Sequence, residues 1–255
     1  MGKEKIEIGL IGQKLGHSFS QGFFQKYFSE NEISDQWSYS NFEIAKASDL
    51  ESFLASTSAV GFNVTIPYKE TILPFLQEIS AEAQQVGAVN TLTKTSAGWK
   101  GDNTDIIGFA NSLKPFLEGQ HENALILGKG GASKAVAFIL KSLGIDYRFV
   151  SRNPEQGDFA YSDINEYVMK HFKLVVNTTP LGMFPNIESK PEIPYSCLTP
   201  NHFLYDLVYN PEITSFLAEG IQRGCLIKNG HDMLIQQALA SFQIWKSNND
   251  PTFLA

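Results

Sequence analysis

The sequence predicts an α/β protein of two domains, and three features of the chain lead to that fold class. Strand-like segments alternate with helix-like segments over almost all of its 255 residues. Some strands, such as 124–128, are continuous apolar runs, which is typical of parallel sheets that helices cover on both faces. The length suits one large domain or two modest ones, at about 100–200 residues per domain.

Apolar periodicity and the residues that cap or break helices set the expected elements. The third strand stops at Pro67 and the fourth helix is interrupted near Pro115, because proline has no backbone N–H to donate. We expect strands at 6–12, 36–44, 61–66, 124–128, 146–151, 173–179, 202–210 and 225–229, helices at 20–30, 48–56, 79–87, 106–117, 132–144, 162–170, 212–224 and 232–248, and a hairpin at 88–105.

A polar segment at 118–123 precedes a new strand, which places a domain boundary near residues 105–122. We expect an N-terminal α/β domain at 1–105 and a Rossmann-like domain at 106–231. The closing helix returns to the first domain, so that residues 232–255 belong to it.

The composition argues against several classes of protein. A formal charge of −7 disfavours nucleic acid as the main partner, while a local basic pocket for a small anion stays open. No run of about 18 apolar residues and no leader at the N-terminus appear, so we expect a cytoplasmic protein without membrane contact. Cys197 and Cys225 suggest reduced thiols, and five scattered histidines give no metal-ligand spacing. We expect a small-molecule partner, no metal, and a monomer or homodimer.

The glycine-rich stretch LILGKGGASKAV is the sharpest local signal. It places Gly128, Gly130 and Gly131 between an apolar strand and an amphipathic helix, and Ala132 is small enough for close packing. In a dinucleotide site the first glycine permits the tight turn, and the next lets backbone N–H groups approach the pyrophosphate at the helix N-terminus. The alternative is a glycine-rich turn that holds no ligand.

The end of the following strand bears on the choice of cofactor. NAD sites usually present an acidic residue about 20 residues after the glycines, to bond the ribose 2′-hydroxyl. Here Ser151 and Arg152 stand in that place, with Arg152 lying 21 residues after Gly131, and no carboxylate is present. An arginine can hold a 2′-phosphate through two parallel hydrogen bonds, so we expect NADP rather than NAD. The alternative is a solvated surface arginine.

The stretch GFNVTIPYKE, at 61–70, alternates apolar residues with Asn63 and Thr65 and then delivers Lys69. A strand with one wet face and a proline stop accounts for the pattern structurally. The functional interpretation is that these three polar side chains line a pocket for a polar substrate.

With these residues in view, the chain resembles the shikimate dehydrogenase family over nearly its full length. Seven motifs occur in the family's order: HSFS (17–20), GFNVTIPYKE (61–70), GAVNTL (87–92), GDNTDIIGF (101–109), VNTTPLGM (176–183), YDLVYNPEIT (205–214) and NGHDMLIQQA (229–238). The chain departs from the family pattern at Lys14, Gln21, Ile106 and Lys129, and it offers only Arg152 where a second basic residue is common.

The resemblance implies hydride transfer between NADPH and the ketone of 3-dehydroshikimate. It assigns Lys69 and Asp105 to catalysis, as the pair that handles the proton and binds the hydroxyl. Without the resemblance, the simplest interpretation is a surface lysine for Lys69 and a helix N-cap for Asp105. His17 is expected to hold a turn and to stay outside the proton path.

The other implied site residues fall into two sets, one for the substrate and one for the cofactor. Ligands in open α/β sheets collect beyond the carboxyl ends of the strands, which places the expected site between the two domains. The substrate set is Ser18, Ser20, Asn63, Thr65, Asn90, Thr104, Tyr209 and Gln237. The cofactor set is Gly128, Gly130, Gly131, Ala132, Ser151, Arg152, Asn177, Thr178, Thr179, Leu207, Gly230 and Met233.

Two alternatives remain at the level of the sequence. One is an enzyme for quinate or another polyhydroxy cyclic acid, with NAD as well as NADP open as its cofactor. The other, from a different class, is a non-catalytic regulator that binds a dinucleotide. The presence of both Lys69 and Asp105 argues against the regulator, because a pure binder has no need of a proton-transfer pair.

Overall fold

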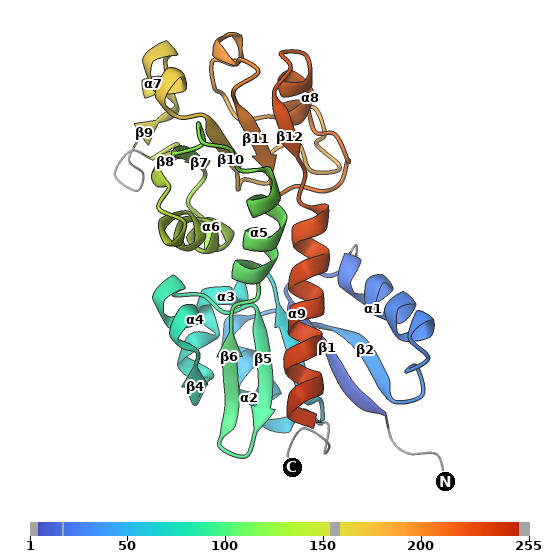
Figure 1. Ribbon diagram of the computed structural model, residues 1–255. Coiled ribbons are helices and arrows are strands. Elements are labelled where there is room, and N and C mark those ends of the chain that lie inside the picture. Colours follow the sequence, from blue (N-terminus) through green and yellow to red (C-terminus); the bar gives the residue numbers. More distant parts are fainter. Residues whose placement is uncertain (1–4, 17, 154–158, 250–255) are drawn as a thin grey trace. The chain divides into compact units, whose positions relative to one another are not determined.

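The computed structural model describes residues 5–16, 18–153 and 159–249 of the chain (Figure 1). These residues form two compact units, which we describe separately. Unit 1 comprises the described residues up to Thr104 together with those from Ala238 onward, and unit 2 comprises Asp105–Gln237.

Unit 1 is built on a six-stranded sheet in the order β2-β1-β3-β5-β6-β4. Strand β1 pairs in parallel with β2 and β3, whereas β5 pairs antiparallel with β3 and β6, so the sheet is mixed. The predicted hairpin is confirmed as β5–β6. The elements are β1 (Ile6–Gly12), α1 (Phe19–Glu30), β2 (Trp37–Glu43), α2 (Leu50–Ser56), β3 (Gly61–Val64), α3 (Tyr68–Thr71), β4 (Glu78–Ile79), α4 (Ala81–Val86), β5 (Thr91–Thr95), β6 (Gly98–Asp102) and, from Ala238, the helix α9 (His231–Asn249).

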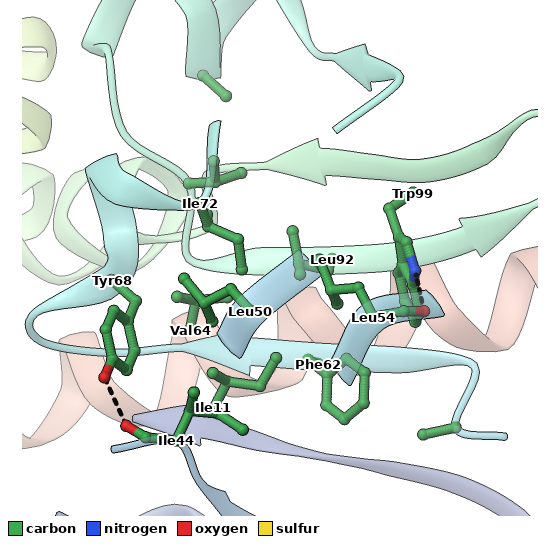
Figure 2. Close-up of a cluster of buried hydrophobic side chains, with 13 residues drawn as sticks. Ile11, Ile44, Leu50, Leu54, Phe62, Val64, Tyr68, Ile72, Leu92 and Trp99 are labelled. Atoms are coloured by element: carbon green, nitrogen blue, oxygen red, sulfur yellow. Dashed lines mark hydrogen bonds between the residues drawn. The ribbon is translucent and has the colours of Figure 1, made fainter. Parts of the chain in front are cut away.

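One face of this sheet packs against helices α2 and α3. Phe62 and Val64 of β3 point into this core, beside Leu50 and Leu54 of α2 (Figure 2). Two polar groups inside the core are paired, since the Tyr68 hydroxyl donates to the Ile44 carbonyl at 2.5 Å and Trp99 Nε1 donates to the Leu54 carbonyl at 3.0 Å. Apolar residues at alternate positions of β3 thus bury one face of the strand, as strand geometry requires.

The opposite face of the same sheet packs against α1 and α9. Phe24 of α1 and Trp245 of α9 are fully buried there, with ring centroids 6.1 Å apart. Trp245 Nε1 donates to the Leu92 carbonyl of β5 at 2.8 Å, which fastens α9 to the sheet. Asn63 alternates with Phe62 and Val64, so its side chain lies on this second face.

Unit 2 contains a six-stranded, fully parallel sheet in the order β12-β11-β10-β7-β8-β9. Leu125 and Leu127 pack on one face with Met169 of α7 and Phe216 of α8. On the other face Phe109 of α5 meets Tyr205, with ring centroids 5.1 Å apart. The elements are α5 (Asp105–Leu113), β7 (Asn123–Leu127), α6 (Gly131–Ser142), β8 (Asp146–Ser151), β9 (Phe159–Ala160), α7 (Glu166–His171), β10 (Leu174–Asn177), β11 (Phe203–Asp206), α8 (Ser215–Ile221), β12 (Leu226–Lys228) and the start of α9.

The predicted fold class is confirmed, with a Rossmann-like unit and a closing helix that returns to the first unit. Differences lie at element ends and in very short strands. The strand expected at 61–66 ends at Val64, just before the cis peptide bond between Ile66 and Pro67. Strands β4 and β9 have two residues each, too few to show an alternating pattern. Among the described residues, none of the helices is both long and apolar enough to cross a membrane.

Candidate active site

In unit 1, polar side chains meet on the sheet face that carries α1 and α9. Asn63 lies at the centre of this group and is 5% exposed. Its Oδ1 accepts a hydrogen bond from the Tyr39 hydroxyl at 2.9 Å, and its Nδ2 donates to Ser241 Oγ at 2.9 Å. The amide of Asn63 is therefore fixed in orientation from both ends.

Ser241 connects this amide to the second half of the unit. Its hydroxyl lies 2.8 Å from Thr91 Oγ1 and 2.9 Å from Thr104 Oγ1. Asn90 Oδ1 accepts from the Thr104 backbone N–H at 2.7 Å and from the Thr104 hydroxyl at 3.2 Å. The predicted substrate residues Asn63, Asn90 and Thr104 are thus brought into one buried hydrogen-bonded network.

The two predicted serines stand at the start of α1. Ser18 is the N-cap residue, and its hydroxyl oxygen accepts from the Ser20 backbone N–H at 3.3 Å. The Ser20 side chain hydrogen-bonds to the phenol of Tyr39, whose pKa burial raises. Since Tyr39 also bonds to Asn63, Ser20 joins the same network. His17, the first residue of this motif, lies outside the described residues.

The backbone of Lys69 is anchored beside this network. Lys69 is half-buried in α3, and its carbonyl accepts the Val89 backbone N–H at 2.8 Å. Val89 directly precedes Asn90, which holds the backbone of Thr104. Thr65 is half-buried and donates its backbone N–H to the Ile11 carbonyl at 2.9 Å. Asp105, 5% exposed, follows Thr104 as the first residue of α5.

Sequence reasoning did not find Tyr39, Thr91 or Ser241. A signal for Ser241 exists, because Ala238, Phe242 and Trp245 form an apolar stripe at helical spacing and Ser241 occupies a position within it. A polar residue on the buried face of a helix needs hydrogen-bond partners. The partners of Ser241 lie in β3, in β5 and in the segment that joins β6 to α5.

In unit 2, the glycine turn between β7 and α6 has the backbone that only glycine adopts readily. Gly128 has φ of +100°, and its N–H donates to the Val150 carbonyl at 2.8 Å. A Cβ there would lie 2.8 Å from Thr179 Cγ2, so the turn passes close to the loop after β10. The first glycine is thus required by backbone conformation and by close approach.

The next glycine faces open space. Gly130 is the N-cap of α6, no side chain caps that helix, and a Cβ added there would meet nothing within 4 Å. Gly131 and Ala132 follow in the first turn of α6. An uncovered helix N-terminus with room before it suits the phosphates of a dinucleotide. The residues of this turn therefore fit such a group.

The loop after β10 is held by its own hydroxyl and amide groups. Thr178 Oγ1 donates to the Leu127 carbonyl at 2.7 Å, and Thr179 Oγ1 donates to Asn177 Oδ1 at 2.7 Å. Asn177 Nδ2 donates to Asp206 Oδ1 at 2.9 Å. These three predicted residues fix the loop beside the glycine turn.

Asp206, which sequence reasoning did not single out, anchors the carboxyl ends of β10 and β11. Its carboxylate also accepts the Thr214 hydroxyl at 2.6 Å and the Val208 N–H at 3.0 Å. Burial raises the pKa of Asp206 to about 6, and the three donors limit that rise.

The remaining predicted residues of unit 2 lie around the ends of β11 and the start of α9. The Leu207 N–H donates to the Asn177 carbonyl at 2.9 Å, and a Cβ at Gly230 would lie 2.1 Å from the Leu207 carbonyl oxygen. Met233 and Gln237 are buried on α9, and Gln237 Nε2 donates to the Leu234 carbonyl at 2.8 Å. Tyr209 is half-buried, which raises its pKa.

The end of β8 carries the predicted cofactor-selecting residues. Ser151 Oγ donates to the Asn153 carbonyl at 2.5 Å, which closes the turn after the strand. Arg152 is exposed. Burial raises the pKa of Tyr161 and the positive charge of Arg152 opposes that rise, so the guanidinium lies near this phenol.

Two surface depressions of unit 1 lie outside the two groups of predicted site residues described above. The first lies beside Glu43 and Asp49 and the second beside Pro74 and Gly98, and neither contains any of the predicted site residues. Within residues 5–16, 18–153 and 159–249, no three histidine, cysteine or acidic side chains gather as a metal site.

The fold and these two groups of residues define a two-unit α/β protein with a Rossmann-like unit of the dinucleotide-binding type. Comparison with known proteins gives the family. Residues 10–92 match the model of the shikimate dehydrogenase substrate binding domain. Shikimate dehydrogenase (NADP(+)) of Crocosphaera subtropica is 37% identical over 96% of this chain and 91% of its own length.

Two solved structures are similar over nearly the whole chain. The crystal structure of shikimate 5-dehydrogenase from Thermus thermophilus, in complex with NADP(H) and shikimate, has a TM-score of 0.83 and 28% identity over 98% of this chain and 97% of that one. Quinate dehydrogenase from Corynebacterium glutamicum, in complex with NAD, has a TM-score of 0.83 and 27% identity over 95% of this chain and 94% of that one. The chain belongs to the shikimate dehydrogenase family.

Proposed function

We propose that this chain catalyses the reversible, NADP-dependent reduction of 3-dehydroshikimate to shikimate. The observation that carries the proposal is full-length similarity to shikimate dehydrogenases (NADP(+)), combined with the buried network that holds Asn63, Asn90 and Thr104. In this assignment unit 1, extended to Asp105, binds the substrate and unit 2 binds the cofactor.

The glycine turn and the loop after β10 are the part of unit 2 assigned to NADP. When bound, the cofactor supplies or accepts the hydride. Gly130, Gly131 and Ala132 would present backbone N–H groups to its phosphates, at the uncapped start of α6. Asn177, Thr178, Thr179, Leu207, Gly230 and Met233 would hold the nicotinamide half, and Ser151 and Arg152 the adenosine half.

Lys69 and Asp105 are assigned to the proton. A ketone that becomes an alcohol needs a proton at its oxygen, and an ammonium group at that oxygen can both donate it and stabilise the developing charge. The Lys69 backbone is bonded to Val89, and Asp105 follows the residue that Asn90 holds. In this assignment the two side chains act on one hydroxyl, where the Asp105 carboxylate would orient the ammonium.

The other polar residues are assigned to the rest of the substrate. We assign Ser18 and Ser20 as hydrogen-bond donors to its carboxylate and Asn63, Thr65, Asn90 and Thr104 as partners of its ring hydroxyls. Tyr209 and Gln237 are assigned to the substrate as well. Because the amides of Asn63 and Asn90 are already oriented by the network, they bind without reordering. A substrate that lacks one hydroxyl would leave such a group buried and unpaired, and the site should reject it.

Initial rates test the proposal directly. NADPH absorbance is followed with shikimate and NADP, and then with quinate or NAD in place of one partner. We expect shikimate with NADP to give the highest kcat/KM. A quinate kcat/KM equal to or above that for shikimate would establish a quinate dehydrogenase instead, and no turnover together with tight NADP binding would establish a regulator.

The setting of the enzyme is part of the same proposal. We assign it to the cytoplasm, acting on small molecules rather than nucleic acid, as a monomer or homodimer. The charge of −7 and the two free cysteines, Cys197 and Cys225, support this assignment. Light scattering coupled to size-exclusion chromatography distinguishes the two oligomeric states.

A further inference from the structure

Lys129 lies inside the glycine turn, between the residue with positive φ and the helix N-cap. A charged side chain at this point is close to the region assigned to the cofactor under the proposed function, on which the following inference rests. The lysine is exposed, and its direction decides which part of a ligand it can reach.

The ammonium of Lys129 is directed towards β8 rather than along α6. Its Nζ lies over the ring of Phe149, 5.3 Å from the ring centroid. The ring is itself supported by Tyr147, at a centroid distance of 5.5 Å in an edge-on arrangement. A cation over an aromatic face is attracted by the ring quadrupole, so the two rings form a platform that holds the lysine at the β8 side of the turn.

The same side of the turn carries Arg152. Leu127 pairs with Val150 in the parallel β7–β8 ladder, and the Gly128 N–H is bonded to the Val150 carbonyl. The segment that follows β7 and contains Lys129 therefore begins beside the end of β8, where Ser151 and Arg152 lie. Neighbouring strands are about 4.8 Å apart. The two neighbouring strand ends are thus each followed by a cation, Lys129 after β7 and Arg152 after β8.

The local sequence after Arg152 supplies no further cation. Residues 153–169 contain no lysine or arginine, and Glu155 and Asp158 add negative charge. A doubly charged phosphate on the ribose 2′ position would be held by a single arginine if Lys129 did not contribute. Charge-assisted bonds from two cations give the discrimination against an unphosphorylated ribose that one exposed arginine supplies weakly.

We propose that Lys129, held by Phe149, is the second cation that binds the 2′-phosphate of the adenosine ribose and so selects NADP over NAD. Its position in the turn substitutes for the missing basic residue after β8. The alternatives are a contact with the pyrophosphate, which NAD shares, and a surface cation–π pair that touches no ligand.

Mononucleotide fragments separate these outcomes without any turnover. Binding of 2′,5′-ADP, 5′-AMP and ADP is measured by isothermal titration calorimetry to the unmodified full chain, to Lys129→Ala and to Lys129→Arg. We expect Lys129→Ala to lower the affinity for 2′,5′-ADP about tenfold or more, because the 2′-phosphate loses a charge-assisted hydrogen bond. The affinities for 5′-AMP and ADP should change by no more than about twofold. Lys129→Arg should retain most of the affinity.

A matched control removes the same charge elsewhere. Lys141 is exposed near the last turn of α6, about 15 Å along the helix from the glycine turn, so Lys141→Ala should not change binding of 2′,5′-ADP. Arg152→Ala serves as the positive control. Phe149→Leu should lower the affinity for 2′,5′-ADP only when Lys129 is present, because the ring acts through the lysine.

Three results would overturn the inference, and the first two of them leave the proposed function intact. A loss for ADP equal to or larger than that for 2′,5′-ADP in Lys129→Ala would place the lysine on the 5′-phosphates, which NAD shares. No loss for any ligand would leave only the surface pair with Phe149. If the unmodified chain binds neither 2′,5′-ADP nor NADP, both the inference and the NADP assignment fall, whereas binding without a Lys129 effect removes the inference alone.

Discussion

At the scale of single residues, Ser241 determines how the polar side chains of unit 1 are arranged. Its hydroxyl contacts the Asn63 amide, Thr91 and Thr104, and the residue is fully buried. Asn63 is 178 positions away in the sequence, so the contact joins two distant segments of the chain. We infer that Ser241 is a positioning residue, which acts on the substrate through Asn63 and Thr104.

Replacing Ser241 with alanine tests this role. Without the hydroxyl, Asn63 Nδ2 retains the Asn90 carbonyl at 3.4 Å, and the free energy of unfolding should fall by about 1–3 kcal/mol. Because the orientation of the amide also loosens, the KM for shikimate should rise several-fold more than kcat falls.

Ser112→Ala is the matched control for that experiment. Ser112 is also a buried helix serine, but its hydroxyl bonds to Tyr205 within unit 2, at 2.6 Å. It should lower stability without changing the KM for shikimate. A Ser241→Ala protein whose stability falls while both kinetic constants stay unchanged would reduce Ser241 to a structural role.

At the scale of elements, the ends of β10 and β11 are joined by one carboxylate. Asp206 accepts three hydrogen bonds, from Asn177, Val208 and Thr214, and so fixes the loop that carries Thr178 and Thr179. Because this carboxyl group is buried, its protonation makes the stability of the folded protein depend on pH.

The pH dependence has a definite sign. The folded-state pKa of Asp206 is raised from 3.8 to about 6, so the folded protein binds this proton more tightly than the unfolded chain. The contribution of this group to the free energy of unfolding therefore decreases as pH rises from about 4 to about 6, by about 3 kcal/mol in total. Asp206→Asn, which keeps the size and cannot ionise, should lose this dependence.

Urea unfolding at pH values between about 4 and about 7 measures the difference between the two proteins. The stability of Asp206→Asn relative to the unmodified chain should increase over this range and then stay constant. Asp146→Asn, at an exposed position of β8, should show no such trend. A constant difference for Asp206→Asn across the range would mean that burial does not perturb this carboxyl.

At the scale of the whole molecule, the sequence predicted the order of helices and strands along the chain better than it predicted which residues and strands contact one another. Alternation of Phe62 and Val64 with Asn63 predicted a strand with one apolar face, and Gly128 predicted the turn, because these signals are local. Ser241 and Asp206 were missed because their importance comes from residues far away in the chain. The order of strands in the unit 1 sheet likewise rests on long-range pairing.

The measurement that tests the central claim most directly compares Lys69→Ala with the unmodified chain, for shikimate oxidation by NADP. We expect kcat to fall about 10²–10⁴-fold, the range typical of a lost proton-transfer group, while the Kd for NADP changes little. An unchanged kcat would contradict the assignment of the proton to Lys69, and with it the mechanism proposed for this enzyme.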